Sequence, residues 1–100
     1  SCIGRGGVAY GIYNIGSDAT LDTKNLTALG ENGGTNYGLR ITAGTATVTQ
    51  GVLEGATYSI VHNGGAITVS NSRLVGGAVS GGVTCVAVSR GAVWSQNTCP

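Results

Sequence analysis

The chain has 100 residues, a length typical of one folded domain. Its formal net charge is +1 and charged residues make up 9% of it, which argues against electrostatic binding of nucleic acid or of anionic lipid. No apolar run approaches the length of a membrane span, so we expect no membrane insertion.

The chain consists of copies of one repeat, which is most regular between Tyr58 and Gly77. In a single domain over residues 1–100, we expect a partial copy (1–9), three full rungs (10–36, 37–57 and 58–83) and a C-terminal capping rung (84–100). The copies start 27, 21 and 26 residues apart. The variation in length falls in residues 29–36 and 78–83, as expected of loops on one face of a solenoid.

Apolar residues recur in four columns, which predict the side chains that stack in the core. In a gapless alignment the columns are Ile12, Leu39, Ile60 and Val86; Ala19, Ala46, Ile67 and Val93; Leu21, Val48, Val69 and Ser95; and Leu26, Leu53, Leu74 and Pro100. Outward hydroxyl residues such as Thr47 and Thr68 alternate with these positions, and a period of two is typical of strands. Glycine pairs such as Gly64-Gly65 separate the strands. The pattern predicts an all-β fold, a parallel β-helix (β-solenoid) of about four rungs.

The runs YGIYNIGSDATLD, TYSIVHNGGAITVSNSRLVGG and VSGGVTCVAVS resemble the bacterial right-handed parallel β-helix repeats of the pectin-lyase-like superfold. The resemblance covers essentially the whole chain, and the ending TCP is similar to the C-terminal end of one such secreted repeat protein. It implies the fold and its right-handed coil, but no single function, because the superfold hosts lyases, hydrolases, adhesins and phage spikes. Asn71 and Asn97 occupy the column in which such coils carry a turn asparagine, whereas Thr23 and Gln50 depart from it.

The acidic residues do not form a catalytic pair. Asp18 and Asp22 are four residues apart on one expected strand, which separates them by about 13 Å, whereas glycoside hydrolysis needs carboxyl groups about 5 to 9.5 Å apart. Glu31 and Glu54 lie on or near the loop face, and no Cys, Asp or Glu stands at metal-ligand spacing from His62, which we expect to be a hydrogen-bonded corner residue. We therefore expect no enzymatic activity, no metal site and no cofactor.

The aligned tyrosines Tyr10, Tyr37 and Tyr58 have two interpretations. If exposed they would form a strip on which sugars stack, and if inward they would form an aromatic ladder that closes the core, which we favour.

Threonines form a second regular column. Thr20, Thr47 and Thr68, with Thr45, Thr49 and Ser70 beside them, make a hydroxyl array interrupted by Asp22, Ala66 and Trp94. Regular threonine arrays on β-solenoids resemble ice-binding surfaces, although threonine is also simply a good outward strand residue.

The three cysteines are an odd number, which in a secreted chain indicates a free thiol or a bond between molecules. We expect a disulfide between Cys85 and Cys99, which would close a loop of about 14 residues and contribute about 3 kcal/mol. Cys2 is then free or bridges two molecules. A Cys2–Cys99 bridge between chains is the second alternative, because the two cysteines share a column of the alignment.

The two ends of the chain predict self-assembly. The chain begins beside Ile3 and ends at Pro100, both in the leucine column, so a second copy would continue the solenoid almost in phase. Trp94 is expected to fold over the open end, and Pro100 cannot donate to a further strand.

Two function hypotheses follow. We favour a secreted, extracellular or cell-surface structural module that stacks end to end with itself into a fibre or filament, or forms a spike or adhesin stem. The alternative is a carbohydrate-binding module that recognises a surface polysaccharide, with ice binding through the threonine array as a minor alternative. Because the chain has neither a signal peptide nor an initiating methionine, we expect it to be processed or a fragment.

Overall fold

A computed structural model describes residues 2–14 and 20–100 of the chain. All the regular structure in these residues is β-strand, as expected from the alternating pattern. The strands form three sheets, which we call sheets A, B and C. Sheet A contains, in spatial order, β1 (Cys2–Arg5), β4 (Thr27–Glu31), β7 (Val52–Gly55), β10 (Arg73–Gly76), β13 (Val88–Arg90) and β14 (Val93–Ser95). Sheet B contains β2 (Val8–Asn14), β5 (Thr35–Ile41), β8 (Tyr58–His62) and β11 (Val79–Ser80). Sheet C contains β3 (Thr20–Lys24), β6 (Thr45–Thr49), β9 (Ala66–Ser70) and β12 (Val83–Val86).

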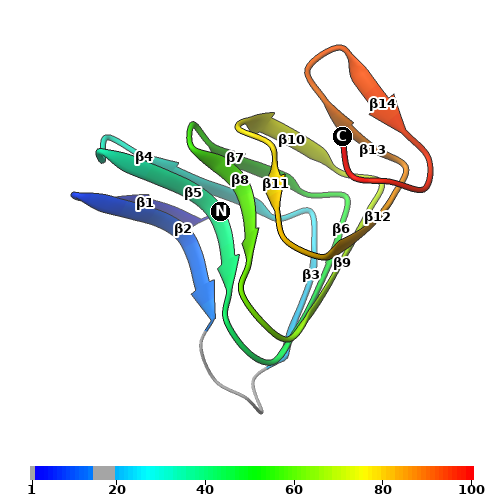
Figure 1. The fold of residues 1–100 in the computed structure, drawn as a ribbon, viewed down its shortest axis with the longest axis horizontal. Helices are drawn as coiled ribbons and strands as arrows, with labels where there is room; N and C mark the ends of the chain where they lie inside the picture. The colour runs from blue at the N-terminus through cyan, green and yellow to red at the C-terminus, as the bar shows by residue number, and fades with distance from the viewer. Residues whose placement is uncertain (1, 15–19) are drawn as a thin grey trace.

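The chain visits the three sheets in rotation, one strand in each, from β1 to β13 (Figure 1). Each strand therefore pairs with the strand three places later in the chain, and these pairs are parallel. The exception is β14, which pairs antiparallel with β13. Three parallel sheets that the chain visits in rotation, so that successive turns stack, are consistent with a β-solenoid.

The predicted register is confirmed between the second and third copies. Leu39 pairs with Ile60, Val48 with Val69 and Leu53 with Leu74. In sheet B the register also extends to the first copy, where Ile12 pairs with Leu39. The second and third copies match in all three sheets because neither contains an insertion relative to the other.

The first copy differs from the alignment in sheets A and C. Leu21 pairs with Ala46 rather than with Val48, and Ala28 rather than Leu26 pairs with Leu53; the predicted column member Ala19 lies outside the described residues. Relative to the second copy, the first copy has extra residues in two connections. Two of them lie between sheet B and sheet C, and four lie between sheet A and sheet B. The prediction that the length variation falls only after the leucine column, in residues 29–36 and 78–83, was therefore wrong.

The last turn also begins earlier than predicted. Val79 rather than Val86 pairs with Ile60, and Cys85 rather than Ser95 pairs with Val69. Likewise, Val83 rather than Val93 pairs with Ile67, and Arg90 rather than Pro100 pairs with Leu74. The physical reason is that β11 has only two residues and only Gly81 and Gly82 connect it to β12, so the last turn is shorter than the others.

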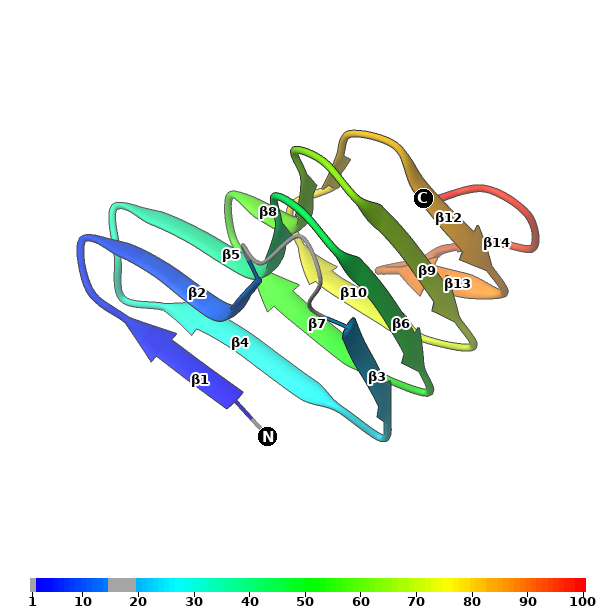
Figure 2. The ribbon, with the colours of Figure 1, turned by 90° about the horizontal axis from the view of Figure 1, so that it is seen from below.

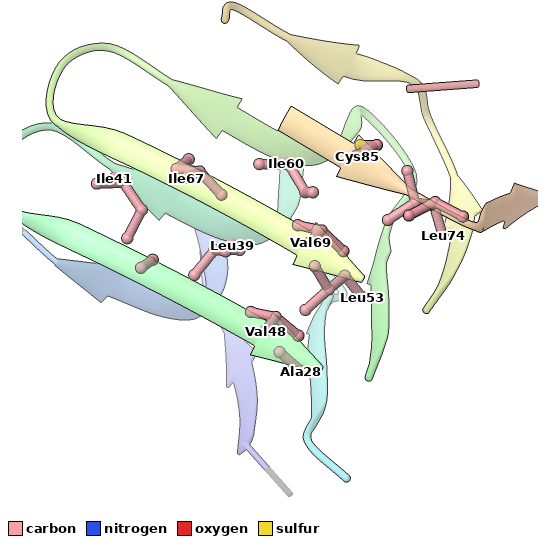
Figure 3. Packing of buried hydrophobic residues seen from close by; sticks show 12 residues of the cluster. Ala28, Leu39, Ile41, Val48, Leu53, Ile60, Ile67, Val69, Leu74 and Cys85 are labelled. Atoms are coloured by element: carbon pink, nitrogen blue, oxygen red, sulfur yellow. The ribbon is translucent and has the colours of Figure 1, made fainter. Parts of the chain in front are cut away.

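The core is the column of apolar side chains inside the three sheets (Figure 3). Its largest fully buried members include Leu39, Ile60 and Leu53, each with no exposed surface. Burial of side chains of this size stabilises the fold by about 1.5 to 3 kcal/mol each relative to exposure.

A ladder of glycines lets sheets A and B approach each other. Its members occupy one register position in three neighbouring strands of sheet A: Gly4, Gly30 and Gly55. Gly76 has the next position, but a Cβ atom there would meet the carbonyl oxygen of Gly55 at 2.6 Å rather than sheet B. A Cβ atom on Gly55 would lie 2.4 Å from the carbonyl oxygen of Tyr58 and 2.6 Å from the backbone nitrogen of Gly38. Because Cβ atoms do not come so close to backbone atoms, these positions exclude every side chain, and only glycine permits this packing.

A second ladder forms the turn from sheet C to sheet A. Asn25, Gln50, Asn71 and Ala87 each follow a strand of sheet C, and all have positive φ, between 48° and 55°. The backbone N–H of Gln50 donates to the carbonyl of Ser70, and that of Asn71 donates to the carbonyl of Val86. The predicted column of turn residues is thus corrected at both ends, since Asn25 takes the place of Thr23 and Ala87 that of Asn97.

Candidate functional site

The C-terminal end of the stack is closed by a disulfide. Cys85 lies in β12 with its side chain in the core, where it is 1% exposed, and it is bonded to Cys99. The Cα atoms of the two cysteines are 5.1 Å apart and 14 residues apart in the chain. The structure thus contains the predicted disulfide, and Cys99 packs against the end of the core.

The tail that carries Cys99 is also held by hydrogen bonds. Ala87 N–H donates to the carbonyl of Gln96 at 2.9 Å, which extends the turn ladder by one step. Arg90 Nε donates to the carbonyl of Pro100 at 3.3 Å. Residues 96–100 and the antiparallel strand β14 therefore cap the end of the stack.

The opposite end is open. Within the described residues, β1, β2 and β3 each have a neighbour on one side only, so their other edges expose unpaired backbone groups. Ile3 is 56% exposed and Val8 is 51% exposed at this end. Cys2, in β1, is a free and exposed cysteine.

The two ends do not match as the sequence alignment predicted. Cys2 pairs with Ala28 in sheet A, whereas Cys99 follows the last strand and is bonded to sheet C, so the two cysteines do not share a column. Sheet A has six strands and sheets B and C have four. A copy placed beyond β14 would therefore not continue sheets B and C in phase, and the basis for a Cys2–Cys99 bridge is lost.

The tyrosines lie on the outer face of sheet B, which corrects the favoured expectation of an inward ladder. Tyr13 follows Ile12, whose side chain packs against the core, so Tyr13 points outward and is 45% exposed. The ring of Tyr10 packs on it with centroids 4.6 Å apart and so lies on the same face. Stacking continues from Tyr10 to Tyr37 at 5.3 Å and from Tyr37 to Tyr58 at 6.0 Å. We call these four residues the tyrosine strip.

Arg40 fixes one end of the tyrosine strip. Its Nη1 donates to the hydroxyl of Tyr10 at 2.7 Å, and its guanidinium lies 5.1 Å from the ring centroid of Tyr13. Its Nε donates to Oδ1 of Asn63 at 3.0 Å. The strip is thus an ordered aromatic surface with a positively charged group, which sequence reasoning missed because it placed the rings inside.

A shallow groove of about 620 Å³ follows the turn from sheet C to sheet A. It is lined by Gln50, Gly51, Val52, Asn71, Ser72, Arg73, Ala87, Ser89 and Trp94. Trp94, in β14, is 63% exposed and pairs with Ser89 in β13. It therefore lies beside this groove rather than folding over the end of the stack as predicted. The groove contains one cation and no carboxylate, a set that offers contacts but no acid–base pair.

The candidate acid and base residues are dispersed. Asp22 lies in β3 opposite Thr47, Asp18 lies outside the described residues, and Glu31 forms an ion pair with Arg5 at 2.7 Å. His62 lies at a corner, where its Nδ1 accepts a hydrogen bond from Gly82 N–H at 3.2 Å and its Nε2 donates to the Gly65 carbonyl at 2.8 Å. Over the described part of the chain, no three His, Cys, Asp or Glu residues are grouped so as to hold a metal ion.

No protein-family model, curated protein or solved structure matches this chain. In the residues that the structure describes, no helix has the length and apolar character of a membrane span. The two unequal ends and the tyrosine strip are the features of the described residues that bear on function.

Proposed function

We propose that the chain is a right-handed parallel β-helix, related to the pectin-lyase-like superfold, that serves as a structural module of a secreted or cell-surface protein and assembles with a second copy of itself. The observation that carries this proposal is the difference between the ends. Within residues 2–14 and 20–100, one end has three strand edges without a neighbour, and the other has a hairpin and the Cys85–Cys99 disulfide.

A disulfide that anchors the cap favours an oxidising location, because such bonds persist in secreted and surface proteins and are rare in the cytosol. The repeat architecture favours a structural role, since each turn stabilises its neighbours and the stack gains length without new chemistry. In this proposal the chain has no catalytic role.

The partner in the proposal is a second copy of the chain, bound through the open end. The unpaired N–H and C=O groups of β1, β2 and β3 favour pairing with another strand edge. Ile3 and Val8 supply apolar surface beside these edges. Two copies that meet through the same end form a closed, two-fold symmetric dimer rather than a filament, because each closed end then points outward.

Sedimentation equilibrium over a wide concentration range tests this pairing. We expect a monomer–dimer equilibrium that persists in reductant and in Cys2→Ser. Ile3→Lys should shift it to monomer, because charged side chains block strand edges. Val93→Lys is the matched control, since Val93 is 54% exposed at the closed end. A parent that stays monomeric at every concentration, or a dimer broken by Val93→Lys alone, would contradict the proposal.

The tyrosine strip favours a second candidate function, carbohydrate binding. Sugar rings have apolar faces that pack on exposed aromatic rings, and the strip offers three stacked rings along the axis of the solenoid with Arg40 beside them. An extended surface polysaccharide fits this shape better than a compact ligand does.

Titration with soluble bacterial polysaccharides, followed by tyrosine resonances in NMR spectra, tests this candidate. Tyr37→Ala should abolish the shifts because Tyr37 is the middle ring. Trp94→Ala, an aromatic change on another face, should leave them unchanged. Equal loss in both variants would place the binding site elsewhere.

A further inference from the structure

The strands β3, β6, β9 and β12 of sheet C lie side by side (Figure 2). Their register places a regular array of hydroxyl groups on the outer face of this sheet. Three outward columns cross its strands: Thr20, Thr45 and Ala66; Asp22, Thr47, Thr68 and Thr84; and Lys24, Thr49, Ser70 and Val86. The interruption that the sequence placed at Trp94 does not exist, because Thr84 pairs with Thr68 and Trp94 belongs to sheet A. We call the outward residues of β6, β9 and β12 the threonine face.

The hydroxyl groups of the threonine face have no hydrogen-bond partner in the part of the chain that the structure describes. Among the described residues, none of Thr45, Thr47, Thr49, Thr68, Ser70 and Thr84 makes a side-chain hydrogen bond, although the strands β6 and β9 are paired with a neighbour on both sides. Ser70 takes part only through its backbone carbonyl. Every one of these hydroxyl groups is thus available to a ligand.

The array is regular in two directions. Neighbouring strands lie about 4.8 Å apart, and outward residues along one strand lie about 6.7 Å apart. Threonine is branched at Cβ and has few χ1 rotamers, so both its hydroxyl and its methyl group hold fixed positions. The threonine face contains no charged residue, because Asp22 and Lys24 lie in β3, at one border.

We propose that the threonine face binds ice. An isolated exposed hydroxyl group gains nothing by exchanging one water partner for another, so it does not distinguish ice from liquid water. A rigid two-dimensional array does distinguish them, because only ordered water can bond to many fixed groups at once without losing further entropy. This function uses a different face from the open end and does not depend on the proposed pairing of copies.

Other occupants fit the threonine face less well. It has no aromatic ring on which a sugar could stack, and its only large exposed apolar residue is Val86 at the border. A protein partner would need an apolar centre, which interfaces typically have. A flat, neutral and hydroxyl-rich surface matches a water lattice instead.

Cys2 provides a label that leaves the threonine face untouched, since it is exposed and lies in sheet A. A maleimide dye on Cys2 should render a growing single-crystal ice hemisphere fluorescent on defined planes. The unlabelled chain should show thermal hysteresis and slow the recrystallisation of ice. Exclusion of the dye-labelled chain from ice, together with no thermal hysteresis, would overturn the proposal.

Two variants test the location of the site. Thr68→Tyr places a bulky ring in the centre of the threonine face and should abolish thermal hysteresis, whereas Arg73→Tyr adds the same ring to the outer face of sheet A and should leave it unchanged. Thr47→Lys is a second probe, which places a hydrated charge beside Thr68. Circular dichroism melts verify folding. Full activity in the two folded sheet C variants would refute the assignment to this face.

Discussion

Substitution of Gly55 by alanine tests whether the glycine ladder controls the packing of sheets A and B. The added Cβ would lie 2.4 Å from the Tyr58 carbonyl oxygen, 2.6 Å from the Gly38 nitrogen and 2.7 Å from the Asn36 carbonyl oxygen. All three are backbone atoms of sheet B, which cannot rotate away as a side chain would. Relief therefore requires the two sheets to separate along several turns.

Overpacking of a core costs about 1 to 3 kcal/mol, and we expect Gly55→Ala to lie at or above the upper limit, since it meets three backbone atoms at once. For a domain of this size, about 3 kcal/mol lowers Tm by about 12 to 24 °C. Thermal unfolding followed by circular dichroism measures this shift.

Gly7→Ala is the matched control for this substitution. No atom lies within 4 Å of the Cβ position of Gly7, and its φ is not in the left-handed region. The lower entropy of the unfolded chain should then stabilise the protein by about 0.4 to 1 kcal/mol. If Gly55→Ala and Gly7→Ala melted within a few degrees of each other, the argument for a steric ladder would fail.

Three further outcomes are expected. Val69→Asp should prevent folding, because it buries a charge without a partner in a thin core, whereas Thr68→Asp on the outer face should fold; circular dichroism distinguishes them. Cys99→Ser should lower the free energy of unfolding by about 3 kcal/mol through loss of the 14-residue loop, measured in guanidinium chloride, and an unchanged midpoint would show that the disulfide does not hold the cap. Ala87→Gly should raise that free energy by about 1 kcal/mol, since alanine is strained at a φ of 55°, and a decrease would contradict the turn geometry.

The sequence was sufficient to predict the sheets and the register of the middle turns. The period of two identifies strands, and it also explains the errors in the first copy. Leu21 replaces Ala19 in its column and Ala28 replaces Leu26, and each replacement is a slip of two residues. A slip of two keeps every side chain on the same face, so the alternation of apolar and polar residues does not detect it, whereas a slip of one would.

The candidate surfaces were predicted less completely because glycines interrupt the alternation of side chains in sheet B. A Cβ atom on Gly11 or Gly38 would meet backbone atoms of sheet A, so these glycines face inward. The tyrosines that precede them therefore face outward instead of continuing the inward pattern. The Tyr-Gly pair in two successive copies was the available signal. The threonine face, by contrast, was visible as a pattern, and only the position of Thr84 within it required the structure.

The disulfide at the closed end makes the two ends of the molecule respond differently to mechanical force. A pull along the axis of the stack loads the hydrogen bonds between one turn and the next, so turns detach successively rather than together. The turn between the second and third copies contains 21 residues, and its release would lengthen a tether by about 70 Å of extended chain. The bond between Cys85 and Cys99 keeps the chain between them from extending. When the molecule is stretched, turns that precede Cys85 can extend fully, whereas the 14-residue segment that the disulfide closes cannot.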